Sequence, residues 1–166
     1  MSVKSTPSFK LEQVVDWRAA VISVLVSGVI FFFALMIGRS LVTGGSIWIV
    51  PRYIAAMVMG QGVLPPPTTF DPVVVLVGFL LNMVIALIFA LILAAIIHEW
   101  SLAVGAVVGA LYGLGIYIIN YYTFSYFFPW FFPSRTWVDI AAHILFGLVA
   151  GAVYELLEVE RYVIED

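Results

Sequence analysis

Four long apolar stretches constrain the fold of this chain more than any other feature. They cover residues 19–38, 72–97, 102–122 and 137–157. Only the last of them contains charged side chains, Asp139 and Glu155. An α-helix of about 20 residues is roughly 30 Å long, which matches the hydrocarbon core of a bilayer. The chain is therefore predicted to be an all-α membrane protein with four transmembrane helices.

The composition supports lipid as the solvent. Of the 166 residues, 64% are hydrophobic and 10% are charged, whereas soluble domains are about half apolar and a quarter charged. A soluble domain of this size could not bury so much apolar surface. The net charge of −3, without a basic run, argues against a nucleic-acid partner. The absence of cysteine excludes disulfides and thiolate metal sites. One transmembrane domain, residues 1–166, is expected.

The connector between the first two spans is too long for a simple turn. Its middle, residues 47–60, is apolar apart from Arg52, and Pro51 suits the first turn of a helix. Trp48, Arg52 and Tyr53 are residues that favour the membrane–water interface. We therefore expect a short interfacial or re-entrant helix over residues 47–60.

Small residues recur four positions apart in the last three spans. In a membrane, such rows let helices approach closely, because lipid provides no hydrophobic drive for association. We expect helix packing within one bundle through these rows; the alternative is a pore or cavity beside the glycines. The packing candidates are Gly78, Ala86, Gly105, Gly109, Gly113, Gly147 and Gly151.

Polar residues within the spans form the main candidate site. Asp139 and His143 are one helical turn apart, so the Asp139 carboxylate could accept a hydrogen bond from the imidazole. Asn82 and Asn120 fall in the same half of the bundle, and the four residues could form one polar cluster. The cluster could be a hydrogen-bonded clamp, part of an ion or proton path, or a contact for a quinone or haem. His98 belongs to the opposite end, so one haem could hardly be held by both histidines.

The segment before the last span is dense in aromatic residues. It reads YYTFSYFFPWFFPSRTW over residues 121–137. Such a loop should lie in the lipid headgroup layer or against another protein, and the two interpretations are equally favoured. The candidates for a partner or membrane interface are Trp48, Phe127, Phe128, Trp130, Phe131 and Phe132.

Two pieces of the chain carry a resemblance. GALYGLGIYIINYY (109–122) and HILFGLVAGAVYELL (143–157) resemble a group of small four-span bacterial membrane proteins of unknown function. Some members carry a "sodium:proline symporter" label that their size does not justify. The resemblance implies the same arrangement of spans and a bacterial inner membrane. It implies no catalytic residues.

Basic residues predict the orientation by a margin of one. The side of the termini would hold Lys4, Lys10, Arg18 and Arg161, against Arg39, Arg52 and Arg135 on the other side. Because the first span has a basic N-terminal flank, we expect both termini in the cytoplasm.

Short polar loops and an aromatic surface favour an accessory or structural subunit of a larger membrane complex, such as a respiratory or photosynthetic electron-transport complex. The alternative is a small oligomeric channel or transporter. No histidine cluster for a metal, nucleophile motif or phosphate loop occurs, so neither an enzyme nor a metal site is expected. The expected partners are the lipid bilayer and other membrane subunits, with bound lipid and no dedicated cofactor.

Overall fold

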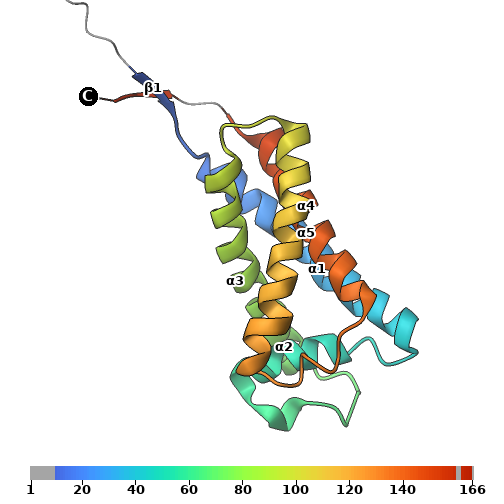
Figure 1. The fold of residues 1–166 in the computed structure, drawn as a ribbon. Helices are drawn as coiled ribbons and strands as arrows, with labels where there is room; N and C mark the ends of the chain where they lie inside the picture. The colour runs from blue at the N-terminus through green and yellow to red at the C-terminus, as the bar shows by residue number, and fades with distance from the viewer. Residues whose placement is uncertain (1–9, 160–161, 166) are drawn as a thin grey trace, which may run out of the picture.

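The computed structural model of the protein describes residues 10–159 and 162–165 (Figure 1). The described elements, in chain order, are β1 (Lys10–Gln13), α1 (Trp17–Thr43), α2 (Ile49–Met59), the 3₁₀ turn η1 (Gln61–Val63), α3 (Pro72–Ile97), α4 (Leu102–Ile118), the π turn η2 (Ile119–Thr123), the 3₁₀ turn η3 (Phe124–Tyr126), α5 (Trp137–Leu157) and β2 (Tyr162–Glu165). Lys4 and Arg161, which count toward the predicted orientation, lie outside the described residues.

Four helices are long and apolar enough to cross a bilayer, which confirms the all-α, four-span prediction. α3 and α5 begin and end at the predicted residues. α1 is longer than predicted, because the Asp16 side chain accepts from the amides of Arg18 and Ala19, and Gly44 ends the helix in a left-handed conformation. The charged residues Arg18 and Arg39 therefore lie inside α1 and not beside it.

The third span also continues beyond its predicted end at residue 122. α4 passes into the π turn η2 and then into η3, so the helical span reaches Tyr126. A π turn widens the helix and is frequent at functional sites. Asn120 and Tyr121, two residues that matter below, both lie in this turn.

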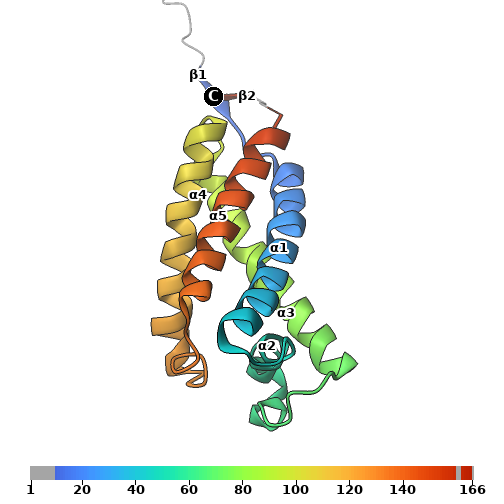
Figure 2. The ribbon, with the colours of Figure 1, turned by 90° about the vertical axis from the view of Figure 1, so that its right-hand side faces the viewer.

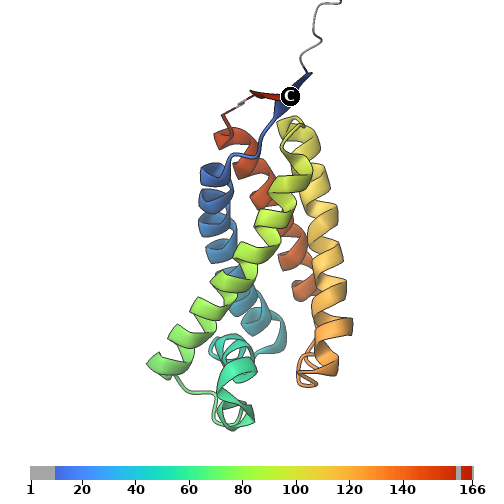
Figure 3. The same ribbon diagram turned by 90° about the vertical axis from the view of Figure 1, so that its left-hand side faces the viewer.

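The four long helices run along one axis, with α5 between α4 and α1 (Figure 2). β1 and β2 pair antiparallel beyond one end, with Lys10 opposite Glu165, which the sequence patterns did not predict. We call this the terminal end. We call the opposite end, which holds α2 and residues 119–136, the loop end. α3 and α4 diverge toward the loop end (Figure 3).

α2 lies across the loop end and packs on α3 (Figure 1). Pro51, Ala55 and Ala56 are buried, and the Arg52 side chain is also buried. The Arg52 guanidinium donates to the carbonyl oxygens of Thr69 and Val63, so it stabilises the segment that follows α2. The Arg52 guanidinium thus faces protein.

Glycine residues form the contact between α4 and α5, which we call the glycine seam. A Cβ added to Gly109 would overlap the carbonyl oxygen of Gly147, and a Cβ added to Gly113 would overlap that of His143. Gly147 and Gly151 meet the backbone of α4 in the same way. These two helices therefore touch through their backbones, the close approach that small residues permit.

The remaining packing candidates serve other contacts. A Cβ on Gly78 would lie 2.5 Å from the carbonyl oxygen of Pro51, so Gly78 admits α2 against α3. Ala86 is buried with Val24 and Phe146, where α3 meets α1 and α5. Gly105 faces the Glu155 side chain and not a backbone.

Candidate functional site

A buried ion pair joins α1 to α5 at the loop end. The Asp139 side chain is 0% exposed, and Arg39 Nε lies 3.6 Å from its Oδ1. The same oxygen accepts from the Tyr121 hydroxyl at 2.6 Å. Oδ2 accepts from the Thr136 amide at 2.6 Å and from the Thr136 hydroxyl at 2.9 Å. Both carboxylate oxygens are therefore satisfied, as a buried charge requires.

The local sequence explains the hydrogen bonds between Thr136 and Asp139 but not the ion pair with Arg39. Thr136 and Asp139 form a capping box at the start of α5, where the helix dipole also favours a carboxylate. The spacing T-x-x-D from Thr136 to Asp139 predicts such a capping box. The partner expected above for the Asp139 carboxylate is instead His143. Arg39 had no such signal, because it comes from the last turns of α1. Its guanidinium also donates to the Ser134 carbonyl and lies 5.6 Å from the Tyr53 ring centroid.

His143 is buried beside the ion pair, but it does not bond to the carboxylate. Its Nδ1 lies 2.6 Å from the backbone carbonyl oxygen of Asp139. A carbonyl only accepts, so Nδ1 donates. In a neutral imidazole Nε2 then accepts, here from the Asn120 amide at 3.0 Å. The expected Asp139–His143 side-chain bond is thus replaced by a bond to the backbone, because the carboxylate already has other donors.

Asn82 lies across the same region on α3. Its Nδ2 donates to the Gly28 carbonyl oxygen at 3.1 Å and so links α3 to α1. It makes no hydrogen bond to the other three predicted residues among those the structure describes. The predicted cluster therefore has three parts: the Asp139 network, the Asn120–His143 pair, and Asn82.

A cavity brings Asn82 and the Asn120–His143 pair together. Its volume is about 80 Å³. This space is enough for a few water molecules or a few ligand atoms. It is lined by Phe31, Leu35, Ile54, Met57, Asn82, Ile85, Asn120, Tyr121, Phe124, Phe131 and His143.

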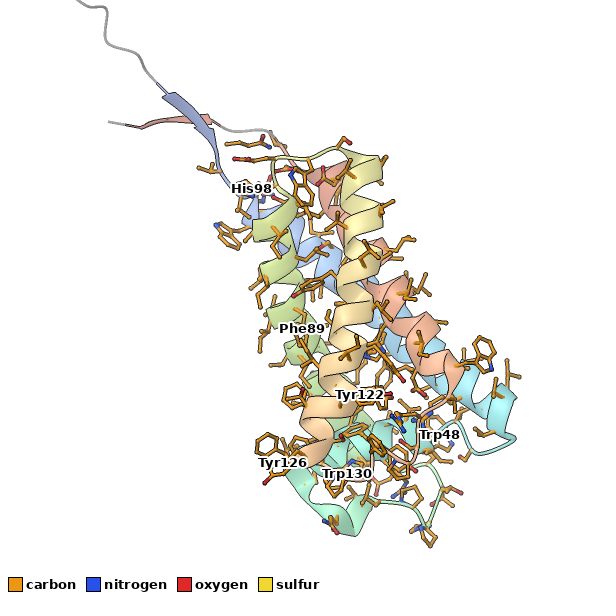
Figure 4. All side chains as sticks on the ribbon, in the orientation of Figure 1. Trp48, Phe89, His98, Tyr122, Tyr126 and Trp130 are labelled. Carbon is orange, nitrogen blue, oxygen red and sulfur yellow. The ribbon has the colours of Figure 1, made fainter. Side chains whose placement is uncertain are left out.

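The predicted aromatic interface residues divide into two groups. Trp130 donates from Nε1 to the Tyr53 carbonyl oxygen at 3.1 Å, and Phe131 lines the cavity. Trp48 packs on Phe70, with 4.8 Å between ring centroids. These three side chains stabilise the loop end itself, while Phe128 is half-buried and Phe127 and Phe132 are exposed. Figure 4 shows the aromatic side chains gathered at the loop end, with Trp48 and Trp130 labelled.

An exposed hollow lies where η2 meets the start of α5. We call it the loop-end hollow and define it by Tyr122, Phe132, Arg135 and Trp137. The Arg135 Cζ lies 3.6 Å from the Phe132 ring centroid and 5.0 Å from that of Tyr122. Of these residues, the sequence predicts only Phe132 as an interface residue. The aromatic run contained the others, but the spacing did not show which would share a surface.

The histidines cannot share a ligand. His98 lies at the terminal end (Figure 4), and both nitrogens of His143 are occupied by hydrogen bonds. Among the described residues, no group of three or more His, Asp or Glu side chains is placed to hold a metal ion. Comparisons of the chain with protein families, with curated proteins and with solved structures find no match.

Proposed function

We propose that this protein is an accessory subunit of a larger membrane protein complex and that the loop-end hollow is its docking surface. The observation that carries the proposal is the make-up of the hollow. Tyr122, Phe132 and Trp137 are 56%, 45% and 66% exposed, and they surround an arginine. Tyrosine, tryptophan and arginine are the residues that dominate the binding energy of protein interfaces.

The hollow is also firmly positioned. Tyr122, Arg135 and Trp137 are sequence neighbours of Tyr121 or Thr136, whose side chains both donate hydrogen bonds to Asp139. A surface held in this way loses little conformational entropy on binding. An aromatic surface needed only as a membrane anchor would not require such a framework, because four spans already hold the protein in the bilayer.

The interior of the bundle supports a structural role over transport. Most polar side chains gather at the two ends, and the buried hydroxyls of Ser23 and Ser27, farther in, donate to carbonyl oxygens of α1 itself. The other buried side chains of the middle are mostly apolar. Among these are Ala90, Ile116 and Phe146 in one cluster, and Leu93, Ala94 and Ala150 in the next. Ions and polar solutes need polar groups or water along their path. Among the described residues, the middle layer offers few polar groups that are not already hydrogen-bonded within the bundle, which favours a docking role.

The proposal is tested by extracting the protein from its native membrane in digitonin and identifying its partners by native electrophoresis and mass spectrometry. We expect a fixed set of membrane subunits with the wild type. The double variant Phe132→Ala/Trp137→Ala should lose those subunits. The matched control Phe33→Ala/Trp17→Ala removes the same two side-chain types from exposed positions on α1 and should keep them.

Two results would contradict docking through the hollow. One is a monodisperse wild-type homo-oligomer without other subunits. The other is an equal loss of partners in the two double variants. Flux of protons or ions into liposomes that disappears with His143→Ala would instead support the transporter.

A further inference from the structure

Three of the described arginines belong to the loop end, and their guanidinium groups differ in what they contact. Arg39 pairs with Asp139, and Arg52 donates to backbone carbonyl oxygens. The Arg135 guanidinium contacts aromatic rings, and it forms no hydrogen bond or ion pair within the part of the chain that the structure describes. Two of the three charges are thus compensated or solvated by the protein itself, and the third is not.

Aromatic rings hold the Arg135 guanidinium in place. Its Cζ lies over the Phe132 ring, 3.6 Å from the centroid, and 5.0 Å from the centroid of Tyr122. A planar guanidinium that stacks on a ring through its face keeps the N–H groups on its edge for other acceptors. Because Arg135 lines the loop-end hollow, these unused donors are presented there.

The loop end offers no carboxylate for Arg135 among the described residues. Asp139 is already paired with Arg39. Asp71, the other acidic residue at this end, caps the start of α3 through its side chain. The remaining described acidic residues belong to the terminal end. The counter-charge for Arg135 therefore has to be sought in a partner.

The next step rests on the proposed docking of a partner over the hollow. A partner that covers the hollow removes water from Arg135, whose guanidinium stays protonated in proteins. A buried charge without an opposite charge strongly disfavours association, so the partner must supply an anion. The hollow has a volume of about 570 Å³, within the range of binding pockets, about 300–1,000 Å³. A side chain of the partner can therefore enter it.

We propose that the partner subunit inserts an aspartate or glutamate carboxylate into the loop-end hollow, where it pairs with the Arg135 guanidinium. A carboxylate and a guanidinium are both planar and form two parallel hydrogen bonds. Docking through the hollow favours a protein carboxylate over a lipid phosphate. A phospholipid would bring two acyl chains and a headgroup, and these would separate the partner from the exposed rings of Phe132 and Trp137.

The first test joins position 135 to the carboxylate covalently. Arg135→Lys keeps the positive charge and introduces a primary amine, which a water-soluble carbodiimide couples to a carboxylate in contact with it. The digitonin-extracted complex is treated with the reagent, digested and analysed by mass spectrometry. We expect an amide bond between the introduced amine and one Asp or Glu of a copurifying membrane subunit. Arg18→Lys introduces an amine at an exposed position of α1 and should not couple to that carboxylate.

The second test measures how docking depends on the charge. Arg135→Met removes the charge but keeps an unbranched side chain beside Phe132, and it should lower the recovery of partner subunits about tenfold or more. Arg135→Glu places like charges together and should lower the recovery further. The matched controls Arg18→Met and Arg18→Glu change the same charge at the exposed position of α1 and should keep the subunits. Size-exclusion profiles confirm that each variant remains folded.

The outcomes separate this inference from the docking proposal. If Phe132→Ala/Trp137→Ala keeps the subunits, the hollow is not the docking surface and both proposals fail. If that double variant loses them while Arg135→Met keeps them, docking stands and the partner carboxylate is refuted.

Two further results would overturn the inference alone. One is the absence of an amide bond at position 135 although the subunits copurify with Arg135→Lys. The other is a wild-type complex that dissociates when phospholipase C removes the lipid headgroups, again without an amide bond in the Arg135→Lys variant. That result would assign the counter-charge to a lipid phosphate.

Discussion

The two ends of the bundle differ in the hydrogen-bond and ion-pair partners that they give to buried carboxyl groups. At the loop end, Asp139 is fully buried and accepts hydrogen bonds or ion-pair contacts from Arg39, Tyr121 and Thr136. At the terminal end, Glu158 accepts from the neutral groups of Tyr154 and Gln13, at 3.0 Å and 3.2 Å. One oxygen of Glu155 is buried without a hydrogen-bond partner in the described part of the chain.

This difference arises from how deeply each carboxyl group is buried and from whether an opposite charge lies beside it. A charge removed from water is tolerated only when an opposite charge and further donors replace its hydration, and Asp139 has both. Glu158 follows the last residue of α5, where water is close, so neutral donors suffice. The loop end is therefore a framework that holds surfaces and a cavity in place, whereas the terminal end tolerates incomplete pairing.

The largest effect is expected from Asp139→Asn. The substitution leaves Arg39 buried without its counter-charge, and it directs an amide hydrogen at a Thr136 or Tyr121 donor. Removing one partner of a buried pair typically costs about 3–5 kcal/mol. The free energy of unfolding, measured in mixed micelles by tryptophan fluorescence, should fall by about that amount.

A second variant shows whether the charge is the cause. Arg39→Met combined with Asp139→Asn removes both charges and should recover much of the lost stability. If Asp139→Asn unfolds like the wild type, the loop end is no more dependent on charge compensation than the terminal end.

The glycine seam allows the two ends to be compared by one kind of substitution. Gly113→Ala, midway along the third span and on the loop-end side of the seam, would force a Cβ into the His143 backbone, which cannot move without separating α4 from α5. Overpacking of this kind costs about 1–3 kcal/mol. Gly105→Ala, near the terminal end, meets only the Glu155 side chain, which can rotate away, so its cost should be smaller.

Gly115→Ala is the matched control, because nothing lies within 4 Å of an added Cβ at that position. It should unfold at the same denaturant concentration as the wild type or at a slightly higher one. Equal losses for Gly105→Ala and Gly113→Ala would show that both ends of the seam are equally rigid.

The smallest expected effect is the pH dependence of stability that comes from Glu158. Burial raises the pKa of the Glu158 carboxyl, against the opposing hydrogen bonds from Tyr154 and Gln13. The folded state therefore retains this proton at pH values where the unfolded state has lost it. Stability should be highest below the ordinary value of 4.5 and should fall as pH rises through the raised pKa.

Glu158→Gln should remove this part of the pH dependence. Unfolding measured at pH 4 and pH 7 should show the variant to be slightly more stable than the wild type at pH 7 and similar to it at pH 4. A variant that is less stable than the wild type at pH 7 would mean that the ionised carboxylate stabilises the terminal end.

Local patterns were sufficient for the helices and for some of their caps. The apolar runs predicted α3 and α5 to the residue, because in lipid a segment must satisfy its own backbone hydrogen bonds and a helix does so. The predicted ends of α1 are wrong, because the cap at Asp16 and the left-handed Gly44 extend the helix past the charged residues Arg18 and Arg39. The β1–β2 pair was missed because each strand needs the other end of the chain.

For the candidate site, the sequence alone determined which residues were too polar for a span and which were small enough for a seam. Only the tertiary structure decided their partners: Arg39 for Asp139, Asn120 for His143, and the Gly28 carbonyl for Asn82. Periodicity assigns a residue to a face of its own helix, but a hydrogen bond depends on two helices meeting at one depth and rotation. Packing between spans sets both, through contacts that no single segment encodes.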